Sequence, residues 1–284
     1  MGRSSRGAAG GRRRLGALAG WLIVLAGMSG PAAAFERGTS DRFLVSLGTY
    51  IMDFNTEASL SSSSGDIGTD INFEDDLGLT SGRSEVRLDG YWRFGARHRL
   101  DFGSFYFGRD AERTLDREIT WGDLVFPVSA RVSTETSTTI IKLAYKYSFH
   151  RGERFEWGAS FGLSTLITKA ELSGDAQAGG GGTSFQGESD SVTAPIPVFG
   201  LHGEFAISRQ VFVRGSVEYF HISLDEQEGS LTDSRLTFDW YPLKHFGFGV
   251  GYNRFVADYE DVGRGEIGFR YEFSGPQGYV TYVF

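Results

Sequence analysis

A histidine and a serine two residues apart form the pair of side chains best suited to nucleophilic chemistry in this sequence. His221 and Ser223 lie in the segment 211–224, in which apolar residues recur at alternate positions. Alternate side chains of an extended strand point to the same face, so both residues share the face of Val217 and Tyr219. A histidine so placed can act as a general base toward a serine hydroxyl. The segment therefore contains a candidate hydrolytic pair on an apolar face.

The acidic run Glu74-Asp75-Asp76, with Asp66 and Asp70 before it, is a candidate for calcium, which prefers carboxylate oxygens. Its spacing does not match an EF-hand loop, in which ligands alternate and a glycine and a glutamate occupy fixed positions. The chain also has no cysteine and no zinc-ligand spacing. We interpret the run as a solvated acidic loop, and we expect no metal and no cofactor.

Charged side chains alternate with large apolar residues along many segments, and their signs nearly balance. This set comprises Glu85, Arg87, Asp89, Arg93, Arg99, Asp101, Lys142, Lys146, Glu156, Glu204, Arg214, Glu218, Arg235, Asp239, Arg270 and Glu272. If these faces enclose a narrow interior, the charges must be paired and hydrogen-bonded. The pattern is compatible with a salt-bridged plug and with a narrow pore of little charge preference. We expect His202, on the same inward parity, to be a hydrogen-bonded structural residue.

The elements that position these charges are β-strands. Residues 141–149 and 155–164 each have one large apolar face and one small or polar face, and the polar stretch 150–154 joins them as a hairpin. The same alternation predicts an all-β, antiparallel barrel of about ten strands, with twelve as the alternative. Besides this hairpin, the expected strands cover about 42–53, 84–94, 98–109, 191–207, 211–224, 231–243, 246–258 and 264–284.

The connections between these strands alternate between short and long. Short turns are expected at 95–97, 150–154, 208–210 and 244–245, and longer ones at 54–83, 110–132, 172–190, 225–230 and 259–263. Short periplasmic turns and long extracellular loops are typical of outer-membrane barrels. After the first 34 residues no apolar run is long enough for a transmembrane helix, so a membrane-spanning chain must be a closed barrel. The loop 54–83 extends the wall or folds inward.

The last expected strand has a change of parity at Gly275-Pro276. Ile267, Phe269, Tyr271 and Phe273 occupy odd positions before it, whereas the apolar residues after it occupy even positions. Proline cannot donate to a strand ladder and is confined to edges and bulges. If both sets of apolar residues face outward, a one-residue bulge is needed, and we predict one here.

Both ends of the sequence indicate export. Five arginines, a short apolar stretch and Ala32-Ala33-Ala34 predict a cleaved signal peptide over residues 1–34, which leaves a barrel domain at 35–284. The ending, with Val280, Tyr282 and Phe284 on one face of a strand, resembles the closing strand of Gram-negative outer-membrane barrels. That resemblance implies an assembly signal, recognised by the barrel-assembly machinery.

Two further runs, residues 68–79 and 91–100, make the chain similar to a group of uncharacterised proteobacterial outer-membrane barrel proteins. The resemblance implies an outer-membrane location, with membrane lipid and lipopolysaccharide as partners, and it implies no activity. Without residues 1–34 the chain has 23 basic and 36 acidic residues, a net charge of about −13, which argues against a nucleic-acid partner.

The expected function is therefore that of a non-enzymatic barrel, structural or forming a narrow channel. The alternative is an outer-membrane lipid-modifying enzyme, because His221-Ile222-Ser223 also resembles the His-x-Ser pair of lipid A deacylases. The asparagine that follows the serine in that family is Leu224 here, which weakens the likeness.

Overall fold

The computed structural model describes residues 42–60, 69–121, 124–178, 181–185, 190–224, 227–261 and 267–284. The predicted signal peptide, residues 1–34, lies outside them. All of the elements are β-strands, and none of the described residues belongs to a helix long and apolar enough to cross a membrane.

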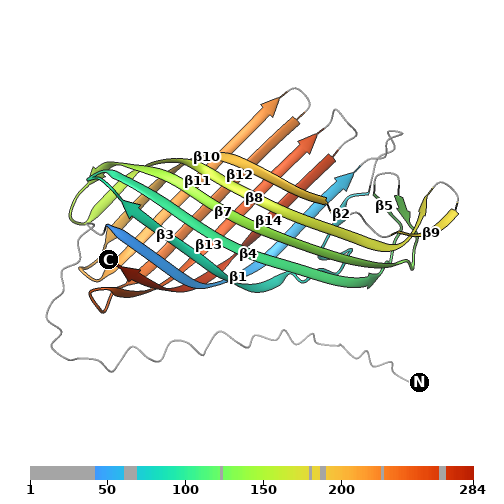
Figure 1. The fold of residues 1–284 in the computed structure, drawn as a ribbon, viewed down its shortest axis with the longest axis horizontal. Coiled ribbons are helices and arrows are strands. Elements are labelled where there is room, and N and C mark those ends of the chain that lie inside the picture. The colour runs from blue at the N-terminus through green and yellow to red at the C-terminus, as the bar shows by residue number, and fades with distance from the viewer. Residues whose placement is uncertain are drawn as a thin grey trace, which may run out of the picture. The chain divides into compact units, whose positions relative to one another are not determined.

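Ten long strands form a closed antiparallel barrel, so the prediction of ten strands is confirmed (Figure 1). Pairing of β1 with β14 joins the first and last strands, and pairing of β8 with β10 completes the ring. The barrel strands are β1 (Phe43–Leu60), β3 (Gly82–Arg93), β4 (His98–Thr114), β7 (Arg131–Arg151), β8 (Phe155–Ala178), β10 (Asp190–Ala206), β11 (Val211–Leu224), β12 (Gln227–Trp240), β13 (Phe246–Asp261) and β14 (Ile267–Val283).

The two ends of the barrel differ. The turns at 94–97, 152–154, 207–210 and 241–245 lie at one end, where the backbone N–H of Phe284 also donates to the carbonyl of Phe43 at 3.0 Å. The opposite end carries the short strands β2 (Ile71–Asn72), β5 (Ile119–Trp121), β6 (Leu124–Phe126) and β9 (Gly181–Phe185). Short turns are periplasmic in outer-membrane barrels, so we expect the second end to be extracellular.

Several strands are far longer than a membrane requires. A transmembrane β-strand needs about 9–11 residues, whereas β7 has 21 and β8 has 24. Much of what the sequence indicated as loops is therefore strand: β1 continues to Leu60, β4 to Thr114 and β8 to Ala178. The expected loop 225–230 is mostly strand as well, because β11 ends at Leu224 and β12 begins at Gln227.

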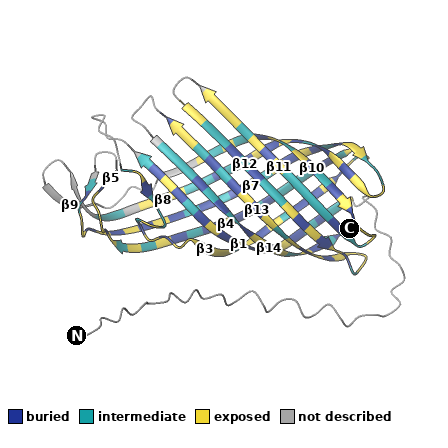
Figure 2. Cartoon of the chain, turned by 180° about the vertical axis from the view of Figure 1, so that it is seen from behind, coloured by how far each residue is buried: buried dark blue, intermediate teal, exposed yellow. Residues whose placement is uncertain are grey.

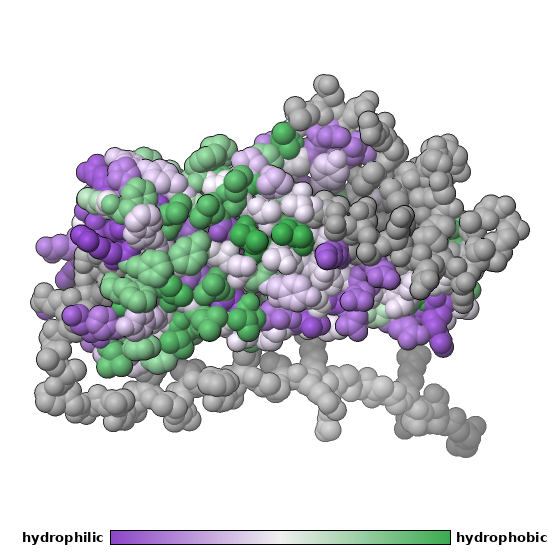
Figure 3. Space-filling view, in the orientation of Figure 1, coloured by the Kyte–Doolittle hydropathy of each residue, from purple (hydrophilic) through white to green (hydrophobic). Residues whose placement is uncertain are grey.

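The outer surface of the barrel is apolar in the part nearer the short turns. Exposed and buried residues alternate along each strand (Figure 2), as period-two side chains require. Apolar side chains gather between a polar rim at the short-turn end and polar side chains toward the long loops (Figure 3). Outward residues of this band are 44–63% exposed and include Leu47, Val86, Trp92, Leu143, Phe161, Leu201, Phe238 and Val280. Such a band faces hydrocarbon.

The predicted bulge in β14 is wrong. The register with β13 continues without a shift through Arg254↔Ser274, Asn253↔Gly275 and Tyr252↔Pro276. Tyr271 and Phe273, expected to face outward, are buried inside the barrel. The side of β14 that faces the lumen is the same along the whole strand, and only the medium outside the barrel changes. Beyond the membrane the outer face meets water, so apolar side chains are buried inside.

The barrel wall also divides toward the long loops. Strands β10 and β11 pair only over Phe199–Ala206 and Phe212–Tyr219, although β10 pairs with β8 from Asp190 onward. Pro195 and Pro197 are two residues apart, so both would direct a backbone N–H to the same neighbouring strand. The β8 ladder continues past them without interruption, so the N–H groups that they lack are on the side toward β11. Strands β3 and β4 likewise pair only near the short turn that joins them, over Arg87–Arg93 and Arg99–Phe105. Figure 1 shows β11–β14 separating from β4, β7 and β8.

Candidate functional site

The lumen contains three layers of side chains. An apolar layer lies at the short-turn end, where its residues are close to strand ends: Leu44, Tyr91, Ala206, Phe212, Tyr241 and Val283. A charged layer follows. An aromatic layer lies beyond it, toward the long loops. The order is visible along β12. Counted from its short-turn end, the strand presents Asp239, Arg235 and Asp233 to the lumen first and the buried Leu231 after them. The charged layer contains the candidate functional residues.

A first group of ion pairs centres on Lys142. Its ammonium group contacts the carboxylate of Glu218 at 2.8 Å and that of Asp233 at shorter range. Asp233 also accepts a hydrogen bond from the amide of Asn253 at 2.5 Å, and Asn253 accepts one from Arg87 at 2.6 Å. These contacts join β7 to β11, β12, β13 and β3 across the lumen.

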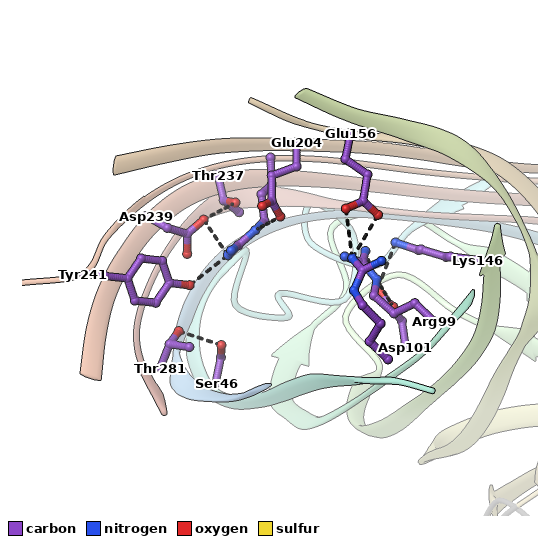
Figure 4. A network of polar contacts seen from close by, with 12 residues as sticks. Ser46, Arg99, Asp101, Lys146, Glu156, Glu204, Thr237, Asp239, Tyr241 and Thr281 are labelled. Atoms are coloured by element: carbon purple, nitrogen blue, oxygen red, sulfur yellow. Dashed lines mark hydrogen bonds and ion pairs between the residues drawn. The ribbon is translucent and has the colours of Figure 1, made fainter. Parts of the chain in front are cut away.

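A second group centres on Arg214 (Figure 4). Its guanidinium contacts Glu204 at 2.7 Å and Asp239 at 3.1 Å, and it donates to the hydroxyl of Tyr241 at 3.0 Å. The hydroxyl of Thr237 donates to Asp239 at 3.1 Å. Each buried charge in this group therefore has at least one opposite charge, as burial requires.

A third group lies on the opposite side of Figure 4. Arg93 contacts both oxygens of Glu156, at 2.9 and 3.0 Å. Asp101 contacts Arg99 at 2.7 Å and Lys146 at 3.0 Å. The arrangement is a network of mutually compensated charges that ties neighbouring strands together.

Most of the sixteen charged residues picked from alternation point into the lumen, and two do not. Arg270 and Glu272 lie on the outer face of β14, where they contact Asp258 at 3.1 Å and Arg254 at 2.8 Å. Their parity was misassigned because the predicted bulge reversed the faces of β14. Asp233 was missed, although it shares the parity of Arg235 and Asp239.

The charged layer encloses a cavity of about 150 Å³. Among the described residues, the charged side chains that line it balance at six acidic and six basic: Asp89, Asp101, Glu156, Glu204, Glu218, Asp233, Arg87, Arg99, Lys142, Lys146, Arg214 and Arg235. Its size and polarity suit ordered water, at roughly 10–15 Å³ for each molecule. His202 also lines this cavity, and neither of its ring nitrogens has a hydrogen-bond partner among the described residues. The expected hydrogen bond to protein is therefore not formed.

The aromatic layer is built around Phe273, which is fully buried. Its ring stacks on Phe255 at 4.7 Å between centroids and meets Phe54, Phe105 and Phe107 at 5.8 Å each. Such geometries add to the gain from burial. This layer occupies the lumen beyond the charged network.

The loop after β1 both extends the wall and covers the interior. Strand β2 pairs with Glu57 and Ala58 of β1, in line with β3. Ile71 and Leu77 are buried in a cluster with Val132 of β7 and with four residues of the connection before it: Leu115, Ile119, Phe126 and Ala130. The sequence left open whether the loop 54–83 extends the wall or folds inward, and the loop does both.

The acidic run of this loop is bound by arginines. Glu74 contacts Arg109, and the backbone N–H of Thr56 donates to Glu74 at 2.8 Å. Asp76 contacts Arg117 at 2.6 Å. These carboxylates tether the loop to β1, β4 and the following connection. Asp66 lies outside the described residues.

Asp76 gives a test of this tether. Hydrogen bonds from Arg117 are the largest cause that holds the pKa of Asp76 below its ordinary value of 3.8. A lowered folded pKa means that the tether is stabilising above pH 3.8, and that this contribution is lost as the pH falls through the folded pKa. We expect Arg117→Gln to raise the NMR titration midpoint of Asp76 toward 3.8. The control Arg83→Gln, whose partner is Glu85, should leave it unchanged; a midpoint insensitive to Arg117 contradicts the tether.

The hydrolytic candidates lie outside the lumen. His221 and Ser223 are exposed, and by alternation they share the outward face of β11 with Tyr219. On β12, Ser230 lies opposite His221 and Glu228 opposite Ser223, so an acid is placed beside the pair. No hydrogen bond joins these four side chains in the part of the chain that the structure describes.

Comparison with known proteins identifies the fold. No family model matches the sequence, and no curated protein matches it. The outer-membrane protease OmpT of Escherichia coli is similar in structure, with a TM-score of 0.59 and 11% identity over 87% of this chain and 98% of that one. Ail of Yersinia pestis (TM-score 0.34, 10% identity, 84% and 98% covered) and OprG of Pseudomonas aeruginosa (0.30, 14%, 88% and 97%) are more distant. The described residues form a closed β-barrel with the fold of a bacterial outer-membrane protein.

Proposed function

We propose that this protein is a non-enzymatic outer-membrane barrel with a closed lumen, which serves as a rigid membrane-embedded scaffold for its extracellular part. The observation that carries this proposal is the aromatic layer beyond the charged network. Eight of the ten barrel strands contribute buried side chains to it: Tyr50, Phe105, Ile140, Leu166, Val198, Leu231, Phe255 and Phe273.

A conducting pore needs a continuous polar path, and three features oppose one. The charges of the lumen are paired with each other. An apolar layer lies on the short-turn side of the cavity, and an aromatic layer lies on the other. The salt-bridged plug is therefore favoured over the narrow pore.

Planar-bilayer recordings test this proposal. We expect bilayers containing the folded protein to stay silent in 1 M KCl, because ions would have to cross apolar layers at high desolvation cost. Heat-modifiable migration on gels, measured on the same preparation, checks that the barrel is folded. Steady unitary conductance steps from folded protein would contradict the closed lumen and favour the narrow pore.

We also propose the partners that the sequence indicated: lipid and lipopolysaccharide around the band, and the barrel-assembly machinery during insertion. Val280 of β14 and Phe284, directly after this strand, support the second of these, because both are exposed. Tyr282 packs edge-on against Phe246 and Phe284, at 4.8 and 4.7 Å between centroids.

A second candidate function is lipid hydrolysis at the outer face. The placement of Glu228 opposite Ser223, with His221 on the same face, supports it, because directly opposite side chains lie about 5 Å apart and diagonal ones about 7–8 Å. An acid, a histidine and a serine within that reach are the components of a nucleophilic triad. The exposed outward face adjoins the lipid-facing band.

Replacement of Ser223 separates the two candidates. For a non-enzymatic barrel, expression of the wild type and of Ser223→Ala in a Gram-negative host should give the same lipid A acylation pattern by mass spectrometry. Ser216→Ala, on the inward face of β11, is the matched control. Loss of one acyl chain with the wild type and its restoration with Ser223→Ala would establish the hydrolase.

A further inference from the structure

A groove on the lipid-facing wall lies where two glycines stand opposite each other. Gly203 of β10 pairs directly with Gly215 of β11. Both alternate with inward charged residues, Glu204 and Arg214, so both face outward. The groove has a volume of about 510 Å³ and is bordered by Leu201, Val217, Leu236 and Tyr252.

The borders of this groove belong to the apolar band. Leu201, Val217, Leu236 and Tyr252 are 50–63% exposed, and each points away from the lumen. The groove is therefore continuous with the surface that already contacts the hydrocarbon of the membrane. An occupant from that phase is apolar, and it reaches the groove without crossing water.

Packing within the wall does not require glycine at either position. A Cβ atom added to Gly203 would have its nearest neighbour at 3.8 Å, and one added to Gly215 at 3.9 Å, which are ordinary contacts. The lipid-facing Gly90 differs, because a Cβ atom added there would meet the ring of Phe102 at 2.5 Å. Glycine weakens a strand, since it adds no packing and loses more entropy on folding. Here it leaves a depression that no side chain fills in the part of the chain that the structure describes.

The depth of the groove indicates which leaflet it faces. Gly203 is three residues from the end of β10 at Ala206, and Gly215 is four residues from the start of β11 at Val211. At about 3.3 Å per residue along a tilted strand, the glycines lie roughly 10–13 Å or less from the short turns. The hydrocarbon core is about 30 Å thick, so the groove lies in the periplasmic half. Glycerophospholipids form that leaflet.

We propose that the groove between Leu201 and Leu236 is a binding site for one acyl chain of a phospholipid in the periplasmic leaflet. The apolar lining, the open glycine pair and the depth in the membrane together specify this occupant. Site and occupant are independent of whether the barrel conducts ions or hydrolyses lipid.

Photo-crosslinking tests the site. The protein is folded into phosphatidylethanolamine vesicles that contain a small fraction of the same lipid with a diazirine in one acyl chain, and adducts are mapped by mass spectrometry after illumination. We expect adducts at Leu201, Val217 and Leu236 to exceed by several-fold those at comparably exposed lipid-facing aliphatic residues elsewhere: Leu47, Val86 and Val250. An even distribution over all of these residues would overturn the proposal.

Filling the groove gives the matched comparison. In Gly203→Leu/Gly215→Leu the enrichment should disappear, whereas Gly278→Leu, an outward position with nothing within 4 Å of an added Cβ, should retain it. Heat-modifiable migration checks folding; if the double variant does not fold, Gly203→Val alone replaces it. Enrichment that survives filling overturns the proposal. A crosslink to a second copy of the chain overturns it as well. In a parallel sample that also contains a diazirine-bearing lipopolysaccharide, adducts confined to that lipid do the same.

Discussion

Replacement of Lys142 by methionine is expected to lower the free energy of unfolding by about 3–5 kcal/mol, because it leaves two buried carboxylates without their cation. Glu218 and Asp233 are 11% and 7% exposed, and Lys142 contacts both. Lipid surrounds the wall outside them, so water cannot replace the ammonium group from that side. Urea unfolding in phospholipid vesicles, followed by tryptophan fluorescence, measures the loss.

Two further variants separate charge from packing at Lys142. Lys142→Met combined with Glu218→Gln and Asp233→Asn removes the uncompensated charges and should recover most of the lost stability. Lys169→Met, on an exposed outward position of β8, should change stability by no more than about 0.5 kcal/mol. If Lys142→Met is as stable as the wild type, the lumen does not depend on this ion pair.

Truncation of Phe273 to alanine should have an effect of similar size, about 3–5 kcal/mol, for a different reason. The side chain is fully buried and meets aromatic rings from β1, β4 and β13. Its removal leaves a cavity at the centre of the aromatic layer, which the rigid barrel wall cannot close. The same urea titration reports it.

Phe248 provides the control for Phe273. It is half-exposed on the lipid-facing side of β13, where alanine removes contact with hydrocarbon and leaves no cavity. We expect Phe248→Ala to cost about 0.3–0.6 kcal/mol, the value of one phenylalanine in lipid. Equal losses for the two variants would show that the lumen beyond the charged layer is not a packed core.

Alternation alone predicted the number of barrel strands and the inward charges of the membrane-spanning part. It succeeded there because every membrane-spanning strand has one apolar face toward the lipid and one polar or charged face toward the lumen. The expected bounds of the seventh strand, 211–224, agree with Val211–Leu224. The missed Asp233 follows from the same rule, so its signal was present in the sequence.

The failures have one physical cause. Tyr271 and Phe273 obey the same backbone parity as Tyr279 and Thr281, but they lie beyond the membrane, where water replaces lipid outside. Apolar residues then turn from the outer to the inner face without any change in the strand. Sequence reasoning that kept apolar residues outside had to introduce a bulge, and it misplaced Arg270 and Glu272. The pairing of charges across the lumen involves strands far apart in sequence, so spacing could not reveal it.

The ion pairs of the lumen also have a consequence for assembly of the barrel. Lys142 on β7 has both of its carboxylates on later strands, Glu218 on β11 and Asp233 on β12. Asp89 on β3 keeps Arg87 of its own strand but gains Arg235 only from β12. A chain that ended after β10 would leave Lys142 without these partners, and an unpaired buried ion costs several kcal/mol. We therefore expect the last strands to stabilise the charges that the earlier strands carry, so that a truncated chain does not form a stable barrel.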